Sequence, residues 1–166
     1  MGDDLSGSPR ISVSGRSGPW QKRSGKLVGR GHSGEQATLP MLYYLSLMNI
    51  FFDVLDTLLT EEGDPRPHAR EVFLELTERG HDVYLWSTAG GVYAAHAASV
   101  LRVEDVVKGC FRKPNPPEGI SVDYVVDDHE RYVEDHGGYL IRPYEGDTGD
   151  RELLGVVEAV EALEID

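Results

Sequence analysis

Apolar and polar residues form blocks of different period along the second part of the chain. Residues 49–53, NIFFD, are an almost continuous apolar run that ends on an aspartate. A run without polar gaps is typical of a strand that is buried on both faces. Residues 68–80, HAREVFLELTERG, instead space their apolar side chains three and four positions apart and end on Gly80. This spacing and the terminal glycine predict an amphipathic helix.

The same alternation continues toward the C-terminus. Further strands are predicted over residues 82–87, 105–111, 122–127 and 138–143, and further helices over residues 91–101, 129–138 and 150–163. We expect the last helix to bury Leu153, Val156, Val157, Val160 and Leu163. Because strands and helices alternate strictly, the pattern predicts a parallel sheet with helices on both faces. The expected fold is therefore an α/β protein with a doubly wound, Rossmann-like sheet of five parallel strands.

The N-terminal segment lacks this pattern. Residues 1–40 contain eight glycines, seven serines and six basic residues against three acidic ones. Such a segment cannot bury enough apolar surface to offset the entropy lost on ordering. We therefore predict a disordered basic tail over residues 1–47, which also suits contact with an acidic partner, and a folded domain over residues 48–166. The natural start of the chain is expected at Met1, Met41 or Met48.

The charge and the composition of the chain limit the kinds of partner and compartment that we expect. The formal net charge of -13 disfavours nucleic acid, because affinity for phosphate backbones requires Lys and Arg. The single cysteine, Cys110, excludes an internal disulfide bond and favours a reducing, cytoplasmic location. The apolar run at residues 41–52 is too short to span a bilayer, so no membrane association is expected.

Reactive residue types stand where the predicted strands end. They are Asp53, then Ser87 with Thr88, then Lys113, and finally Asp127 with Asp128. In a parallel sheet of this kind, the carboxyl ends of the strands form the functional site. A carboxylate there can attack phosphorus, and oxygen ligands can hold Mg²⁺. A hydroxyl group and an ammonium group can hold phosphoryl oxygens while their charge changes.

Four motifs in this order resemble those of the haloacid-dehalogenase-like (HAD) superfamily, most of whose members are phosphatases. The matching segments are FFDVLDTL with Asp53 and Thr57, VYLWST with Ser87, RKPNP with Lys113, and YVVDDH with Asp127 and Asp128. The resemblance covers about residues 48–163. It implies a nucleophilic Asp53 assisted by Lys113, with Thr57, Ser87 and Thr88 near the phosphate. It also implies Mg²⁺ bound by Asp53, Asp127, Asp128 and the backbone carbonyl of Leu55.

Leu55 departs from the family pattern. Phosphatases of the family carry a second acid here, which protonates the leaving oxygen and then activates water. Its loss costs roughly 10²–10⁴-fold in rate. The neighbouring Asp56 is a candidate substitute, although that position tends to point elsewhere in the family. Dehalogenases of the superfamily also lack this acid, but they usually carry a helical cap domain.

The spacing leaves no room for a cap domain. Only 33 residues separate Asp53 from Ser87, and 25 separate Ser87 from Lys113. The resemblance then implies an open site, which suits a large phosphorylated substrate or closure by a second copy of the chain in a homo-oligomer.

Simpler roles compete at each position. Asp53 can cap a turn, Ser87 and Thr88 can cap the helix that starts near Gly91, and Asp128 can cap the helix at His129. Lys108 is an alternative to Lys113 as the lysine of the site. Cys110 is expected to be a small buried apolar residue. The histidines show no metal-ligand spacing. Two functions remain: a magnesium-dependent phosphomonoester hydrolase with weakened activity, or an inactive relative that binds a protein or a phosphorylated ligand. We favour the enzyme, because the rest of the set is intact.

Overall fold

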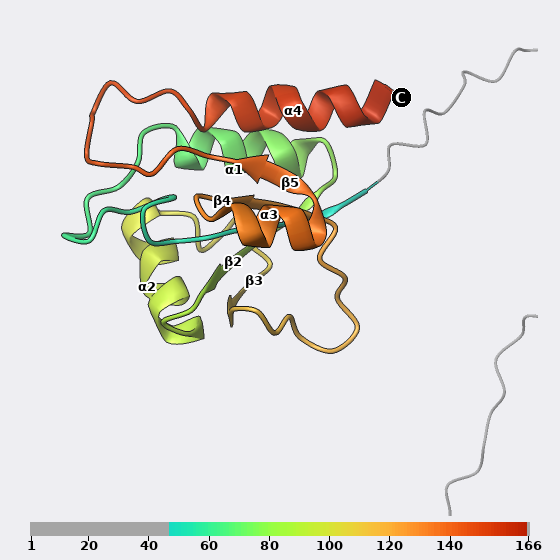
Figure 1. Cartoon of the computed structure of the whole chain (residues 1–166), viewed down its shortest axis with the longest axis horizontal. Coiled ribbons are helices and arrows are strands. Elements are labelled where there is room, and N and C mark those ends of the chain that lie inside the picture. The colour runs from blue at the N-terminus through green and yellow to red at the C-terminus, as the bar shows by residue number, and fades with distance from the viewer. Residues whose placement is uncertain (1–46, 166) are drawn as a thin grey trace, which may run out of the picture. The chain divides into compact units, whose positions relative to one another are not determined.

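The predicted alternation is realised as five strands and four helices in the computed structural model, which describes residues 47–165 (Figure 1). The elements are β1 (Asn49–Phe52), α1 (Ala69–Glu78), β2 (Asp82–Ser87), α2 (Gly91–Leu101), β3 (Gly109–Arg112), β4 (Tyr124–Asp127), α3 (Glu130–His136), β5 (Gly138–Leu140) and α4 (Leu154–Ile165). The tail predicted over residues 1–47 lies outside the described residues, except for Leu47.

All five strands are parallel and lie in the order β3-β2-β1-β4-β5. The chain first builds outward from β1 to β3, and then returns to the other side of β1 with β4. The order reverses between β1 and β4, which is the switch point where α/β sheets open a crevice at their carboxyl ends. The predicted five-stranded parallel α/β sheet is confirmed.

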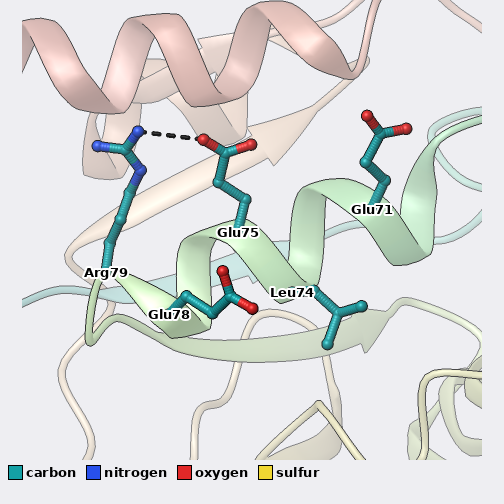
Figure 2. Close-up of a pocket in the computed structure, with 5 residues that line it drawn as sticks. All are labelled: Glu71, Leu74, Glu75, Glu78 and Arg79. Atoms are coloured by element: carbon teal, nitrogen blue, oxygen red, sulfur yellow. Dashed lines mark hydrogen bonds and ion pairs between the residues drawn. The ribbon is translucent and has the colours of Figure 1, made fainter.

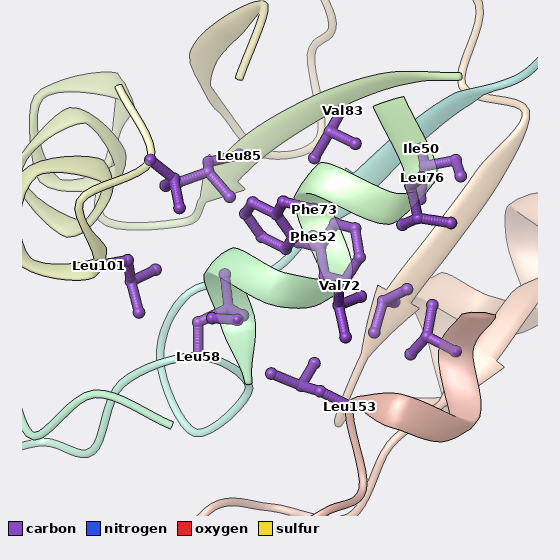
Figure 3. Packing of buried hydrophobic residues seen from close by; sticks show 14 of the residues in the cluster. Ile50, Phe52, Leu58, Val72, Phe73, Leu76, Val83, Leu85, Leu101 and Leu153 are labelled. Atoms are coloured by element: carbon purple, nitrogen blue, oxygen red, sulfur yellow. The ribbon is translucent and has the colours of Figure 1, made fainter. Parts of the chain in front are cut away.

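The side chains of the central strands point alternately to the two faces of the sheet, where they pack into two separate hydrophobic cores. Ile50 and Phe52 of β1 point to one face, where they meet Val83 and Leu85 of β2. Three helices cover this face with apolar side chains, among them Phe73 of α1 (Figure 3). The other members of this core from the helices are Ala69, Val72 and Leu76 of α1, Ala94, Ala97, Ala98 and Leu101 of α2, and Val156, Val157 and Val160 of α4. This face holds most of the buried apolar surface, which is the main favourable term in folding.

The opposite face has a smaller and more aromatic core. Phe51, Tyr84, Trp86 and Val125 are buried there. Their cover consists of α3, which contributes Tyr132, and of the loop between β3 and β4, which contributes Ile120 and Val122. Helices therefore lie on both faces, as in a doubly wound sheet, but α3 has no fully buried residue of its own.

Element boundaries differ most from the sequence prediction at the starts of the third strand and the last helix. The third strand begins at Gly109 instead of residue 105, because the amides of Val106 and Val107 donate to the carbonyl of Val103 in a turn. The last helix begins at Leu154 instead of residue 150, because the Asp150 carboxylate accepts a hydrogen bond from the Glu152 amide in the preceding turn.

Two burial predictions were wrong. Leu163 is 51% exposed, because at that end of α4 it is Glu164 that reaches the neighbouring elements and bonds to His81. Cys110 is only half-buried, because β3 is an edge strand of the sheet and has a neighbour on one side alone.

A buried arginine fastens the connection between β1 and α1. The side chain of Arg66 donates two hydrogen bonds of 2.9 Å to the two carboxylate oxygens of Asp150. Its remaining terminal nitrogen donates to the carbonyls of Thr57 and Arg142. Arg66 thus joins the loop after β1 to the loop before α4, and holds both at the carboxyl end of the sheet.

Within the described part of the chain, no helix combines the length and the apolar character needed to cross a membrane.

Candidate active site

Four strand ends bring their polar side chains to one edge of the sheet. Asp53 follows β1, Ser87 ends β2, Lys113 follows β3 and Asp127 ends β4. Because the strands are parallel, these residues share one edge, and they meet at a cavity of about 210 Å³. Asp53, Ser87 and Lys113 line the cavity, while Asp127 lies behind Lys113 and is completely buried.

A three-membered charge cluster forms the base of this cavity. The Lys113 Nζ atom lies 2.6 Å from Asp53 Oδ1 and 2.6 Å from Asp127 Oδ2. The same ammonium group sits 4.1 Å from the ring centre of Tyr132 and 5.6 Å from that of Trp86. All three members of the cluster are at most 6% exposed. Two carboxylates and a single ammonium group leave a net negative charge that is almost completely buried.

The charge imbalance shows in the pKa values. Burial raises the pKa of Asp53 to about 6, with Lys113 opposing the shift and Asp127 adding to it. Burial lowers the pKa of Lys113, but the adjoining Asp53 and Asp127 carboxylates outweigh it and hold that pKa above its ordinary value. Lys113 is therefore a permanent cation here, and Asp53 is ionised at neutral pH. Ionisable groups in a cleft whose pKa values are shifted by burial and by a specific charged neighbour are typical of functional sites.

Other side chains form the wall and the rim. Leu55, Thr88, Tyr93 and Tyr132 line the cavity, and so do Asp56, Ala89 and His129. Ser87 is buried, and its Oγ accepts a hydrogen bond from the Ala89 amide. Asp56 takes a positive φ of 59° in the turn after Leu55, and this turn brings it to the cavity where we expected it to point elsewhere.

A second group of oxygen and nitrogen atoms adjoins the cluster. Ligand atoms of Asp127, Asp128 and His129 lie within 4.8 Å of one another. The Asp128 carboxylate bonds to His129 Nδ1 at 3.0 Å and accepts from the Thr57 hydroxyl at 3.4 Å. That hydrogen bond to Asp128 raises the pKa of His129. Thr57 is completely buried and is absent from the cavity wall, so it supports Asp128 and does not face the cavity.

The structure decides between several competing roles. Lys108 pairs with Asp82 at the start of β2, at the opposite edge of the sheet, and Lys113 alone of the two reaches the cavity. The α2 helix has Gly90 at its N-cap position with no side-chain hydrogen bond, so neither Ser87 nor Thr88 caps it. Asp128 does not cap α3 either, because the amide of His129 donates to Asp127 Oδ1.

A different hollow runs along the exposed side of α1, lined by Glu71, Leu74, Glu75, Glu78 and Arg79 (Figure 2). Its basic residue, Arg79, is already paired with Glu75 of the same helix and with Glu161 of α4. The acidic side chains diverge along the helix surface and do not converge on one point (Figure 2). This arrangement is that of a solvated helix face and offers no site for chemistry.

Sequence reasoning missed four residues of the cavity, which are Ala89, Tyr93, His129 and Tyr132. Tyr93 lies in the first turn of α2, and Tyr132 lies one helical turn beyond Asp128 on α3. His129 is exposed, and it lines the cavity as well. The available signal was positional: helices that follow β2 and β4 begin at the carboxyl edge of the sheet, so their first turns border any site there.

The fold and this cavity define the chain as an α/β protein with a charge-bearing crevice at the carboxyl edge of a parallel sheet. Comparison with models of protein families and with curated proteins found no match.

Proposed function

We propose that the chain is a HAD-like hydrolase that cleaves phosphomonoesters, with Asp53 as the nucleophile. The observation that supports this most is the contact of Lys113 with both Asp53 and Asp127, at 2.6 Å in each case, where β1, β3 and β4 end. A structural ion pair needs one carboxylate for one ammonium group. The surplus carboxylate is costly in a buried place, and its retention suits a function in catalysis.

Each residue of the cluster has a role in this reaction. The Asp53 carboxylate, ionised at neutral pH, attacks phosphorus and forms an aspartyl phosphate. The Lys113 ammonium group stabilises the negative charge that moves onto the phosphoryl and leaving oxygens. Ser87 accepts a hydrogen bond from Ala89, which leaves its hydroxyl proton to donate to a phosphoryl oxygen.

The donor set suits Mg²⁺, which binds one or two carboxylates and keeps several waters. Lys113 contacts both Asp53 and Asp127. The Asp128 carboxylate lies close to that of Asp127 in the group that also contains His129, so that the three carboxylates are neighbours. These three residues, with the Leu55 carbonyl, would hold the ion. Bound there, it would offset the negative charge of the cluster and that of the phosphate.

Leu55 limits the rate. Its side chain lines the cavity and is 42% exposed, but it has no proton to give to a leaving oxygen and cannot activate water. Substrates whose leaving group departs without a proton are therefore cleaved best.

The connections after β1 and β3 suit an uncapped site. In the described chain, residues 53–68 contain turns and isolated bridges and residues 113–123 contain turns, with no helix or further strand in either. An uncapped site suits a large phosphorylated substrate or closure by a second copy. A cytoplasmic location agrees with the single cysteine and the acidic charge.

A second candidate function is binding without catalysis, and Leu55 is the observation that favours it. In that case the cluster holds a phosphorylated ligand or a metal ion, and the protein acts through a partner.

The hydrolase and the binding protein can be distinguished by measuring hydrolysis of 4-nitrophenyl phosphate by the full chain, with and without Mg²⁺. We expect magnesium-dependent turnover that is lost in Asp53→Asn and rises in Leu55→Asp by roughly 10²-fold or more. Asp135→Asn is the matched control, because Asp135 is an exposed acid of α3 that does not line the cavity, and it should keep the turnover of the wild type. Absence of turnover in both the wild type and Leu55→Asp would reject the hydrolase and leave the binding protein.

A further inference from the structure

The walls of the cavity differ in character from its base. The base carries the charged cluster, but Leu55, Tyr93 and Tyr132 present apolar and aromatic surface above it. Leu55 is 42% exposed, and the cavity that it lines is the one that contains Asp53 and Lys113. Apolar and aromatic walls around a few placed polar groups are typical of pockets that bind small molecules.

The charges around the cavity argue against a second anionic group on the ligand. Lys113 and His129 are the basic residues that line it within the described part of the chain, and both are already paired with carboxylates. Asp56 adds a further acid to the wall. A ligand with a carboxylate or a second phosphate would therefore face acids without meeting a free cation.

The size of the cavity agrees with a ring and one phosphoryl group. Cavities of roughly 150 Å³ are large enough for a benzene ring. The cavity here measures about 210 Å³, which leaves space for a phosphoryl group at its charged base.

We propose that the substrates are phosphate monoesters of phenols, in which an uncharged aromatic ring packs against Leu55, Tyr93 and Tyr132 as the phosphoryl group meets Asp53 and Lys113. This inference rests on the proposed hydrolase. It also explains how leucine is tolerated at position 55. Phenols have a pKa of about 10, so a phenolate departs with far less need of a proton than an alkoxide does.

The chemistry balances with water as the co-reactant. An Asp53 oxygen forms a bond to phosphorus, and the bond between phosphorus and the phenolic oxygen breaks, with its electron pair leaving on the phenolate. Water then attacks phosphorus, the bond to Asp53 breaks, and the carboxylate is restored. One water proton passes through solvent to the phenolate, which yields a phenol and inorganic phosphate.

Phosphonates, whose carbon–phosphorus bond is not hydrolysed, test the ring contact without turnover. Titration calorimetry of the full chain in Mg²⁺ should show that phenylphosphonate binds about tenfold tighter than methylphosphonate, because the ring leaves water. The Leu55→Ala and Tyr93→Ala variants should each reduce that preference by about threefold. Val92→Ala is the matched control, because Val92 lies beside Tyr93 on α2 and is 88% exposed. It should keep the full preference.

A charged ring sharpens the test. We expect 4-carboxyphenylphosphonate to bind more weakly than phenylphosphonate, by about fivefold, because its carboxylate approaches Asp56 without a cation. Melting curves of each variant show that the fold is intact.

Equal affinity for the two uncharged phosphonates, or a preference that survives both Leu55→Ala and Tyr93→Ala, would overturn this inference and leave the hydrolase standing. Selective binding of phenylphosphonate without hydrolysis of phenyl phosphate, even in Leu55→Asp, would support the ligand class and reject the hydrolase. Failure of both phosphonates to bind would overturn the inference, while turnover of phenyl phosphate would still decide on the hydrolase.

Discussion

Two buried basic side chains meet aspartates in this protein, and their charges are balanced differently. Arg66 has a single bidentate partner, Asp150, and its other terminal nitrogen donates to two backbone carbonyls. Lys113 contacts two carboxylates, so that the group keeps a net negative charge. The Arg66 pair lowers the pKa of Asp150, whereas burial raises that of Asp53 to about 6.

Under the proposed function, this difference separates a structural ion pair from a reactive one. Where each donor and acceptor is matched, a buried ion pair holds two loops together, and removal of one partner leaves an uncompensated charge. Where one carboxylate is in excess, the folded state carries a cost that a more stable design would avoid. Enzymes often keep such costs at their active sites, because activity requires groups that are poorly stabilised in the free protein.

The largest effect is expected from breaking the balanced pair. Asp150→Ala leaves the Arg66 guanidinium, whose side chain is fully buried, without its anion. We expect the free energy of unfolding to fall by about 3–5 kcal/mol, measured by urea denaturation.

The Arg70–Asp105 pair is the matched control, because its bidentate distances of 2.8 and 2.9 Å are similar but it lies at the surface. Asp105→Ala should leave the urea midpoint nearly unchanged. Equal losses in the two variants would show that burial is not what separates these pairs.

A somewhat smaller fall in the free energy of unfolding is expected when the cluster of Asp53, Lys113 and Asp127 loses its cation. Lys113→Met leaves Asp53 and Asp127 facing each other without a counter-charge. We expect a loss of about 2–3 kcal/mol at pH 7.5 and a much smaller one at pH 5, because protonation of a carboxylate removes the repulsion. Denaturation curves at the two pH values measure this difference, and a loss that is the same at both would contradict the account.

The smallest effect has the opposite sign. The folded-state pKa of Asp53, about 6, lies above its value of 3.8 in the unfolded chain. Ionising Asp53 therefore costs stability, and this cost develops as the pH rises from about 4 to 6 and is complete above 6. Asp53→Asn removes it, and we expect the variant to be about 1–2 kcal/mol more stable than the wild type at pH 7.5.

The gain in Asp53→Asn should disappear below about pH 4, where the aspartate is protonated in both states. Thermal melting across this range measures it. A variant that is less stable than the wild type at pH 7.5 would show that Asp53 is a structural partner of Lys113 and not a surplus acid.

The two regions also differed in how well the sequence predicted them. Asp53, Ser87, Lys113 and Asp127 end or follow strands with clear apolar patterns, and the parallel topology alone brings them to one edge. Arg66 stands in a proline-rich loop that shows no periodicity, and its partner Asp150 is 84 residues away. Nothing local marks such a pair, so only the folded structure reveals it.

Within the site itself, prediction failed where side chains come from helices. The positions of Tyr93 and Tyr132 depend on how α2 and α3 pack against the sheet, and the sequence pattern does not specify that packing. Thr57 is the reverse case, because the sequence indicated a place beside the phosphate and the structure places Thr57 outside the cavity lining. It points instead to Asp128, since the turn after Val54 buries it.

Rapid-mixing measurement of phenol release tests the central claim most directly. With Asp53 as nucleophile and Leu55 unable to activate water, the first step should outrun the second, so that an aspartyl phosphate accumulates. We predict a burst of nitrophenol from 4-nitrophenyl phosphate that equals the enzyme concentration, followed by slow turnover. The burst should be absent in Asp53→Asn and replaced by faster linear release in Leu55→Asp. Release that is linear from the first turnover and unchanged in Asp53→Asn would contradict a nucleophilic Asp53.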